Sequence, residues 1–240
     1  MPCFNEEATV EAALRRVVAS PWTSEVIVVD DGSTDATLER VERLVERLVD
    51  RLAGDPGSDV GEIRFTVLAE PVNRGKGAAL RRGIPAATAP FVVVQDADLE
   101  YDPVDYATLL GPLLDGRADA VYGSRFLADR PHRVLYYWHY VGNRALTTLS
   151  NMFTNLNLSD MESGYKAFRR EVIQGITIEE DRFGFEPEIT AKVAAGGWRV
   201  YEVGVGYDGR TYADGKKIGW RDGVWAMWCI VRYGVAARCR

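Results

Sequence analysis

The amino-acid sequence predicts an α/β protein with a mostly parallel, doubly wound sheet and helices on both faces. Two observations predict it. Short apolar runs of strand length alternate, over residues 1–125, with stretches whose apolar residues recur at helical spacing. Each run also ends in a polar or glycine-containing cluster. Repeated β-α-β units of this kind form parallel sheets, because each helical crossover returns the chain in the same direction.

The elements of this first half are justified in chain order. Asn5 is expected to cap a helix whose apolar face contains Val10, Leu14 and Val17. Residues 25–29 form a short apolar run that ends in the turn-forming DDGSTD, so a buried strand is expected there. The same criteria predict helices over 38–52, from 77 and over 104–114, a loop at 54–61, and strands at 64–69, 91–95 and 119–123.

The stretch PCFNEE, residues 2–7, has the composition of the polar end of a strand followed by a helix. No strand precedes it, so the first strand of the sheet is expected to be missing from the chain. Two explanations remain open: the protein begins upstream of Met1, or the fold tolerates the loss. We expect the first.

Composition fits an ordinary globular protein, with 47% hydrophobic and 27% charged residues among 240. No run approaches the ~18 to 20 apolar residues that a membrane-spanning helix needs. The start of the chain lacks the features of a signal peptide, and three cysteines fit neither paired disulfides nor a zinc site. A cytoplasmic setting is therefore expected.

Charge is unevenly distributed along the chain. The net charge is −6, yet residues 209–240 carry seven Lys or Arg against two acids, and residues 125–170 carry seven against three. This asymmetry favours an anionic partner for the second half, although solvated helix faces would explain much of it. No nucleic-acid-binding motif accompanies the charge, so nucleic acid is not expected as the partner.

The stretch VVVQDADLEYDP, residues 92–103, brings three carboxylates to the end of a predicted strand: Asp96, Asp98 and Glu100. Alternation in an extended segment puts Asp96 and Asp98 on one side. Such carboxylates either share a proton or hold a hard cation such as Mg²⁺ or Mn²⁺ together with substrate phosphates. A plain turn and helix cap at 98–102 is the alternative. The position after a β run, downstream of DDGSTD, favours the cation.

Seven motifs, in order along nearly the whole chain, carry a family resemblance: PCFNEE, VVDDGSTD, NRGKGAAL, DADLEYDP, GSRF, DMESGYKAFRREV and GRTYADGK. With them the chain resembles the family-two inverting glycosyltransferases of the A-type fold, closest to the dolichyl- or polyprenyl-phosphate mannosyltransferases. The resemblance implies a catalytic domain over 1–208 and a basic, aromatic C-terminal segment over 209–240. Within the domain, 1–125 would bind the nucleotide-sugar and 126–208 the acceptor.

The resemblance also implies roles for individual residues. The residues that would bind the nucleotide-sugar donor are Pro2, Phe4, Glu6, Val29, Asp31, Asp96, Ala97, Asp98, Arg125, Arg210 and Lys216. The metal would be held by Asp96, Asp98 and Glu100, where Glu100 replaces the Gln common in the family's mannosyltransferases. Arg125 and Arg133 are expected to contact an acceptor phosphate. The catalytic residues would be Asp98, Arg125, Asp160 and Glu186. Outside the motif context, Arg125 would fit a surface cap, and Arg210 and Lys216 ordinary tail charges.

The reaction implied is displacement at the sugar's anomeric carbon, with mannose leaving GDP for a polyprenyl or dolichyl phosphate. A phosphate monoester has a second pKa of ~6 and could attack unaided, whereas a hydroxyl would need a base, Asp160 or Glu186. A UDP-sugar donor or a saccharide acceptor on the same fold is one alternative. A catalytically idle nucleotide-sugar-binding module of a membrane complex is another.

Two segments mix aromatic and basic residues, 130–158 and 216–234. Such a mixture suits the interface of a bilayer, so peripheral contact with the cytoplasmic face of a membrane is expected, with a membrane protein as a further candidate partner. The alternative is that both are amphipathic helices that use their aromatic residues to cover the catalytic domain.

Overall fold

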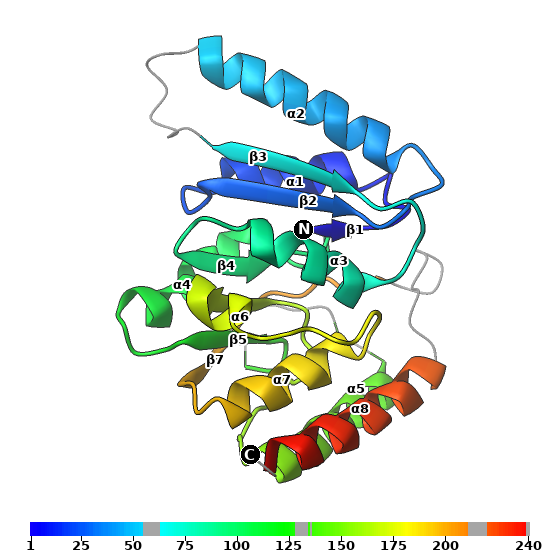
Figure 1. The fold of residues 1–240 in the computed structure, drawn as a ribbon, viewed down its shortest axis with the longest axis vertical. Helices are drawn as coiled ribbons and strands as arrows, with labels where there is room; N and C mark the ends of the chain where they lie inside the picture. Colours follow the sequence, from blue (N-terminus) through cyan, green and yellow to red (C-terminus); the bar gives the residue numbers. More distant parts are fainter. Residues whose placement is uncertain (55–62, 128–133, 135, 211–219, 239–240) are drawn as a thin grey trace.

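The structure, a computed structural model, describes residues 1–54, 63–127, 134, 136–210 and 220–238. Its first sheet is parallel and has the order β1-β2-β3 (Figure 1). The strands are β1 (Pro2–Cys3), β2 (Glu25–Asp30) and β3 (Arg64–Ala69). The expectation of no strand before Asn5 was wrong. The backbone N–H groups of Val29 and Asp31 donate to the carbonyls of Met1 and Cys3, which is enough to form β1.

The second sheet has the order β4-β6-β5-β7. It contains β4 (Phe91–Val94), β5 (Ala120–Ser124), β6 (Lys166–Arg169) and β7 (Val200–Gly204). Strand β6 runs antiparallel to both of its neighbours, whereas β5 and β7 are parallel. The sequence did not predict this insertion, because β6 pairs with strands about 50 and 75 residues earlier in the chain.

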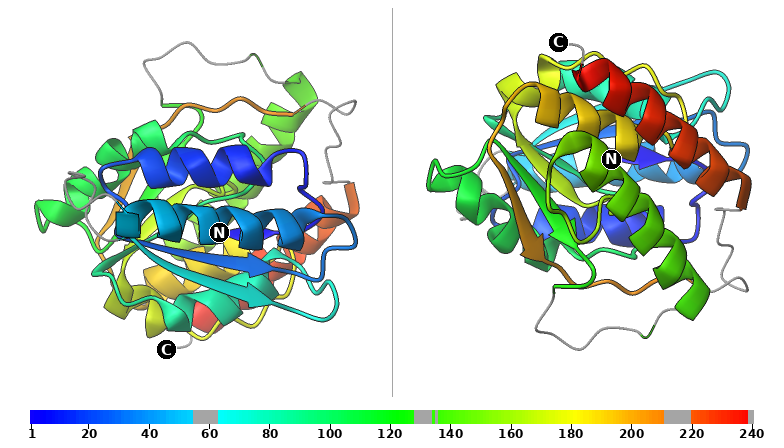
Figure 2. Two further views of the ribbon diagram at one scale, coloured as in Figure 1. Left: turned by 90° about the horizontal axis from the view of Figure 1, so that it is seen from above. Right: turned by 90° about the horizontal axis from the view of Figure 1, so that it is seen from below.

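Helices cover both faces of the sheets, as expected. Helix α1 lies behind β2 in Figure 1 and α3 in front of it, and the view from above shows the same separation (Figure 2). The helices are α1 (Val10–Ala19), α2 (Thr37–Gly54), α3 (Lys76–Gly83), α4 (Tyr106–Leu114), α5 (Tyr137–Thr154), α6 (Arg170–Gln174), α7 (Phe185–Ala195) and α8 (Trp220–Arg238). Short 3₁₀ turns lie at Ile84–Ala86 and Pro103–Asp105.

Within the C-terminal segment the structure describes residues 209–210 and helix α8. Helix α8 packs side by side with α5 at the end of the molecule away from β3 (Figures 1 and 2). Ile230 joins the main hydrophobic cluster, together with Phe185 and Phe168. Buried Glu180 accepts hydrogen bonds from Trp225 Nε1 at 2.9 Å and from the Tyr233 hydroxyl at 2.8 Å. Helix α8 is therefore held against the rest of the protein by apolar packing and by buried hydrogen bonds.

Most of the expected elements are confirmed, and one helix start is not. Helix α1 begins at Val10, after Thr9. Asn5 instead has a φ of 51° and accepts a hydrogen bond from the backbone N–H of Thr34 at 2.8 Å. Its side chain thus joins the loop after β1 to the loop after β2. The expected loop at 54–61 lies outside the described residues, except for Gly54, which ends α2.

Gly77, in the first turn of α3, gives a first prediction. A Cβ at this position would lie 2.1 Å from the carbonyl oxygen of Glu180. Because that neighbour is backbone, it cannot rotate away. We expect Gly77→Ala to lower the free energy of unfolding by about 1–3 kcal/mol or more, as measured by urea denaturation. Gly111→Ala, where a Cβ would meet nothing within 4 Å, is the control. Equal stability of the two variants would contradict the prediction.

Candidate functional site

The loops that follow β1, β2, β4 and β5 meet around one cavity of about 560 Å³. This convergence is expected, because these strands end at the same edge of their sheets. The wall is strongly charged. Its acids are Glu6, Asp31, Asp96, Asp98, Glu100, Glu162, Glu186 and Asp222, and its cations are Lys76, Arg125, Arg182 and Arg210. The acids outnumber the cations by two to one, so this wall favours a positively charged ligand group.

Asp31, directly after β2, fixes the loop that leads into α3. Its carboxylate accepts hydrogen bonds from Asn73 Nδ2 at 2.8 Å and from the backbone N–H of Gly75 at 2.6 Å. Burial raises the pKa of Asp31 above its usual range, although these donors act against that rise. Gly75 has a φ of 111°, which glycine adopts readily. The NRGKG motif is thereby held against the cavity, whose wall includes Asn73, Gly75 and Lys76.

The DADLE turn after β4 carries Asp98 and Glu100 on either side of Leu99. Leu99 has a φ of 64°, which is unusual for a bulky residue and marks a turn that the surrounding structure enforces. Burial, together with the charges of Asp96 and Glu100, raises the pKa of Asp98 to about 7. In this turn, burial and the neighbouring negative charges therefore outweigh the opposing charge of Arg210.

Arg210 closes over these carboxylates from the far end of the chain. Its guanidinium donates to both oxygens of Glu6 at 3.1 Å and to Asp98 Oδ2 at 3.1 Å. Its backbone N–H donates to Glu100 Oε1 at 2.8 Å, and the Tyr207 hydroxyl donates to Glu100 Oε2 at 2.8 Å. Glu6 and Glu100 thus position the segment that carries Arg210.

Lys76, at the start of α3, links two carboxylates that are far apart in the sequence. Its Nζ lies 2.9 Å from Asp96 Oδ2 and 3.1 Å from Glu186 Oε1. From the sequence, NRGKG is interpreted as a helix-entry loop that lines the nucleotide pocket, and Lys76 is not named as a site residue because the motif lacks the spacing of a phosphate-binding loop. A charged residue within a glycine-rich helix entry was the available signal.

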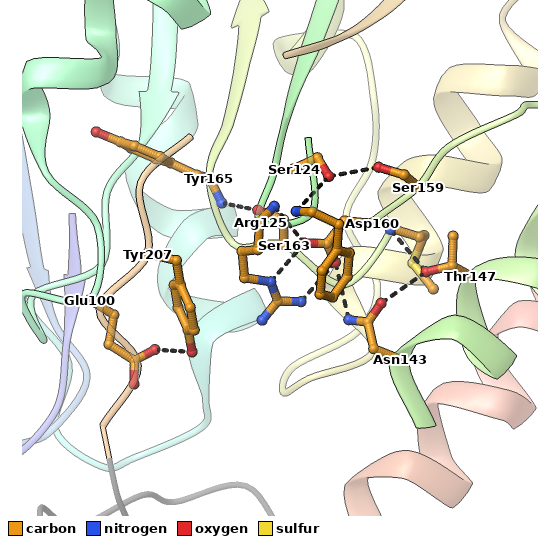
Figure 3. A network of polar contacts seen from close by, with 12 residues as sticks. Glu100, Ser124, Arg125, Asn143, Thr147, Ser159, Asp160, Ser163, Tyr165 and Tyr207 are labelled. Atoms are coloured by element: carbon orange, nitrogen blue, oxygen red, sulfur yellow. Dashed lines mark hydrogen bonds and ion pairs between the residues drawn. The ribbon is translucent and has the colours of Figure 1, made fainter. Parts of the chain in front are cut away.

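Arg125, just after β5, forms a buried ion pair with Asp160 (Figure 3). Arg125 Nε lies 2.6 Å from Asp160 Oδ2, and Nη2 lies 2.7 Å from Oδ1. Asn143 on α5 donates to Oδ1 at 3.0 Å, and the Tyr207 ring lies against the guanidinium. Burial acts to raise the pKa of Asp160, but Arg125 outweighs it and holds the pKa below its usual range. Asp160 is therefore arranged to position Arg125.

Of the other residues expected to bind the nucleotide-sugar, some line this cavity and others do not. Pro2, Phe4 and Ala97 line the cavity with the charged residues above. Val29 is buried and lines a separate cavity of about 350 Å³ between β2 and β4. Arg133 and Lys216 lie outside the described residues. Glu162 lines the cavity but was not singled out, although it lies two residues after Asp160 in the same motif.

Each of the three expected metal ligands has a different partner within the protein. Asp96 pairs with Lys76 and Asp98 with Arg210, while Glu100 accepts from Tyr207. Among the described residues, no group of three acids, histidines or cysteines is arranged as a ready-made metal site. The donor chemistry nevertheless fits a hard divalent cation, because Asp96 and Asp98 offer oxygens from one short loop in a cavity with excess negative charge.

Comparison with known proteins supplies the family. Residues 1–177 match the model of glycosyl transferase family 2. Glycosyltransferase AglJ of Haloferax volcanii is 30% identical over 86% of this chain and 61% of its own length. The polyprenol monophosphomannose synthase of Mycolicibacterium smegmatis is 27% identical over 99% of this chain and 86% of its own. The chain thus spans less than two thirds of the first of these relatives.

Solved structures show the same fold. Glucosyl-3-phosphoglycerate synthase from Mycobacterium tuberculosis, in complex with Mn²⁺, uridine diphosphate and glucosyl-3-phosphoglycerate, superposes with a TM-score of 0.70 at 22% identity. The match covers 98% of this chain and 78% of that one. The expected A-type α/β fold is therefore confirmed. With its family match over residues 1–177, its fold and its charged cavity, the chain belongs to glycosyl transferase family 2.

Proposed function

We propose that the protein transfers a hexose with inversion from a nucleotide-sugar, mannose from GDP-mannose in the first instance, to a polyprenyl or dolichyl phosphate. One observation carries the proposal: four strand-end loops bring a carboxylate-rich turn and two arginines into a single cavity. Asp98 lies against Arg210 there, and Arg125 is fixed by Asp160. The relative named as a polyprenol monophosphomannose synthase supports the choice of acceptor.

In the proposed reaction, the side chains act mainly through charge. Mg²⁺ or Mn²⁺, held by Asp96 and Asp98 with Glu100 nearby, would neutralise the diphosphate that leaves the sugar. Pro2, Phe4 and Asp31, which line the cavity, would contact the nucleotide. Arg210, which pairs with Glu6 beside the carboxylates, would be a further cation for the departing phosphates. Arg125, together with Arg133, would orient the acceptor phosphate, which attacks as a dianion without a base.

A lipid acceptor would need a surface that meets the membrane. No helix among the described residues has the length and apolar character to span a bilayer. Helices α5 and α8 do expose aromatic rings: Tyr137 is 68% and Trp138 is 78% exposed on α5, and Trp225 and Trp228 are about half exposed on α8. Aromatic residues of this kind suit the interface of a bilayer, which supports peripheral attachment to a membrane. The face that we propose is the cytoplasmic one.

Incubation with labelled donors tests the proposal. The protein would be mixed with Mn²⁺, a short polyprenyl phosphate, and radiolabelled GDP-mannose, UDP-glucose or UDP-N-acetylglucosamine. Label extracted with the lipid from GDP-mannose is the expected result. Parallel reactions would contain 3-phosphoglycerate in place of the lipid.

Each other outcome names a different function. If the lipid is labelled only from a UDP-sugar, the donor is that UDP-sugar and not GDP-mannose. If only phosphoglycerate is labelled, the acceptor is phosphoglycerate and not the lipid. Nucleotide-dependent thermal stabilisation without turnover of any donor would indicate a catalytically idle binding module, because a ligand that binds only the folded state raises the melting temperature.

A further inference from the structure

Two carboxyl oxygens in the cavity are buried and have no hydrogen-bond partner in the described part of the chain: Glu162 Oε1 and Glu186 Oε2. Burying a polar atom without a partner is costly, so each such atom in a native protein calls for an explanation, and a bound ligand is one. Both residues line the same cavity. Neither oxygen is used by the metal site, the nucleotide end or Arg125 in the function proposed above.

The supports of both glutamates are rigid. Glu186 lies in the first turn of α7, and its residue is 4% exposed. Its other oxygen, Oε1, is held by Lys76 at 3.1 Å. The loop that carries Glu162 is held by the fully buried Lys166. Its Nζ donates hydrogen bonds to the backbone carbonyls of Met161, at 2.9 Å, and of Ser163. The unpartnered oxygens are therefore fixed features of the cavity wall.

Both glutamates lie next to the carboxylate assigned to the metal and diphosphate. A single nitrogen, Lys76 Nζ, lies 2.9 Å from Asp96 and 3.1 Å from Glu186. On the other side, a Cβ on Gly164 would lie 2.5 Å from Asp96 Oδ2, so the loop of Glu162 passes directly against Asp96. A sugar joined to a diphosphate at Asp96 would thus have these glutamates as its neighbours.

The chemistry of the pair selects its ligand. An anion would be repelled by the two carboxyl groups, and an apolar group would leave both oxygens unpartnered. Two cations, Lys76 and Lys166, already lie beside the pair. Burial and the charge of Glu186 raise the pKa of Glu162 to about 8, so near neutrality one negative charge of the pair is removed. An uncharged ring with several hydroxyl groups satisfies both oxygens.

We propose that Glu162 and Glu186 form the binding subsite for the transferred hexose, with Glu162 Oε1 and Glu186 Oε2 each accepting a hydrogen bond from a ring hydroxyl. The assignment rests on the function proposed above, because it takes the diphosphate to lie at Asp96. It adds two specificity-determining residues.

Isothermal titration with two ligands separates the sugar from the nucleotide. In the presence of Mn²⁺, the Kd of GDP and of GDP-mannose would be measured for the wild type and for Glu162→Ala, Glu186→Ala and the double variant. UDP and UDP-glucose would be run in parallel. We expect each single variant to weaken binding of the nucleotide-sugar about tenfold or more, because each removes a buried hydrogen-bond partner and leaves a ring hydroxyl of the sugar unpaired. The Kd of the bare nucleotide should stay within about twofold for Glu162→Ala.

A second measurement varies the donor, first with the wild-type protein and then with the single variants. Donors that each lack one ring hydroxyl are titrated in turn, and at least one should bind about tenfold more weakly than the full donor. That loss should disappear in Glu162→Ala or Glu186→Ala, because the partner oxygen is then absent. Glu171→Ala, at an exposed position on α6, is the matched control and should behave as the wild type.

The outcomes are distinguishable. If Glu162→Ala weakens nucleotide and nucleotide-sugar equally, or weakens neither, the subsite is wrong while the transferase function stands. Equal binding of all the deoxygenated donors by the wild type also overturns the subsite. If the wild type binds none of the nucleotides, the proposed function itself fails, and the subsite fails with it.

Discussion

Asp98→Ala is expected to reduce hexose transfer at least about 100-fold, because it removes a group that would hold the metal against the departing diphosphate. The fold should survive the change. Burial and repulsion from Asp96 and Glu100 raise the pKa of Asp98 to about 7, so its charge is not a net source of stability. Arg210 also keeps its contacts with both oxygens of Glu6. Transfer of labelled sugar and urea denaturation measure the two effects.

A third measurement connects the loss of activity to the metal. Stabilisation by nucleoside diphosphate in the presence of Mn²⁺ should be seen in the wild type and be lost in Asp98→Ala. Asp115→Ala is the control, since its side chain is 57% exposed and pairs only with the equally exposed Arg117 among the described residues. Full transfer activity in Asp98→Ala would reject the metal assignment. Unfolding of the variant would show instead that Asp98 supports the fold.

Asp160→Ala is expected to lower the free energy of unfolding by about 3–5 kcal/mol, the usual result of leaving one partner of a buried ion pair alone. Asp160 is 0% exposed, and its two oxygens accept from Arg125, at 2.6 and 2.7 Å, and from Asn143. The Arg125 side chain is 15% exposed, so water can partly solvate its charge when Asp160 is absent. The expected loss is therefore at the lower end of this range. Urea denaturation measures the loss.

Two further results separate positioning from simple instability. In the double variant Arg125→Met/Asp160→Leu the buried charges are both removed, so stability should recover part of the loss. Transfer should be abolished in this variant, because Arg125 is absent. Glu39→Ala, which breaks the exposed pair with Arg43 on α2, should cost less than about 1 kcal/mol. A loss from Asp160→Ala no greater than that of Glu39→Ala would contradict the assignment of a buried, positioning pair.

The contribution of Asp160 should also depend on pH in one direction. Its folded-state pKa lies below the ordinary value of 3.8, so the folded state binds its proton less readily than the unfolded state does. The stabilisation is therefore complete above the unfolded-state pKa and is lost as the pH falls through the folded-state value. Between pH 5 and 7, the free energies of unfolding of the wild type and of Asp160→Ala should differ by a constant amount of about 3 kcal/mol.

The sequence by itself determined the alternating strands and helices and the loops that meet at the strand ends. Strands such as 25–29 and 64–69 can be predicted from the sequence, because the spacing of apolar residues follows the period of the element whose buried face they form. The side of the sheet at which Asp31, Asp98 and Arg125 meet followed from parallel topology alone. The seven motifs then pointed to the family.

Only the tertiary structure decided which charged groups meet. Arg210 pairs with Glu6 across 204 residues, Lys76 joins Asp96 to Glu186, and β6 inserts antiparallel between β4 and β5. Asp160, a candidate base in the sequence, has both of its oxygens engaged in the structure. Periodicity reports whether a residue faces the core or the solvent. The partner of a buried charge depends on which chain segments the fold brings within hydrogen-bond distance, and no local pattern encodes that distance.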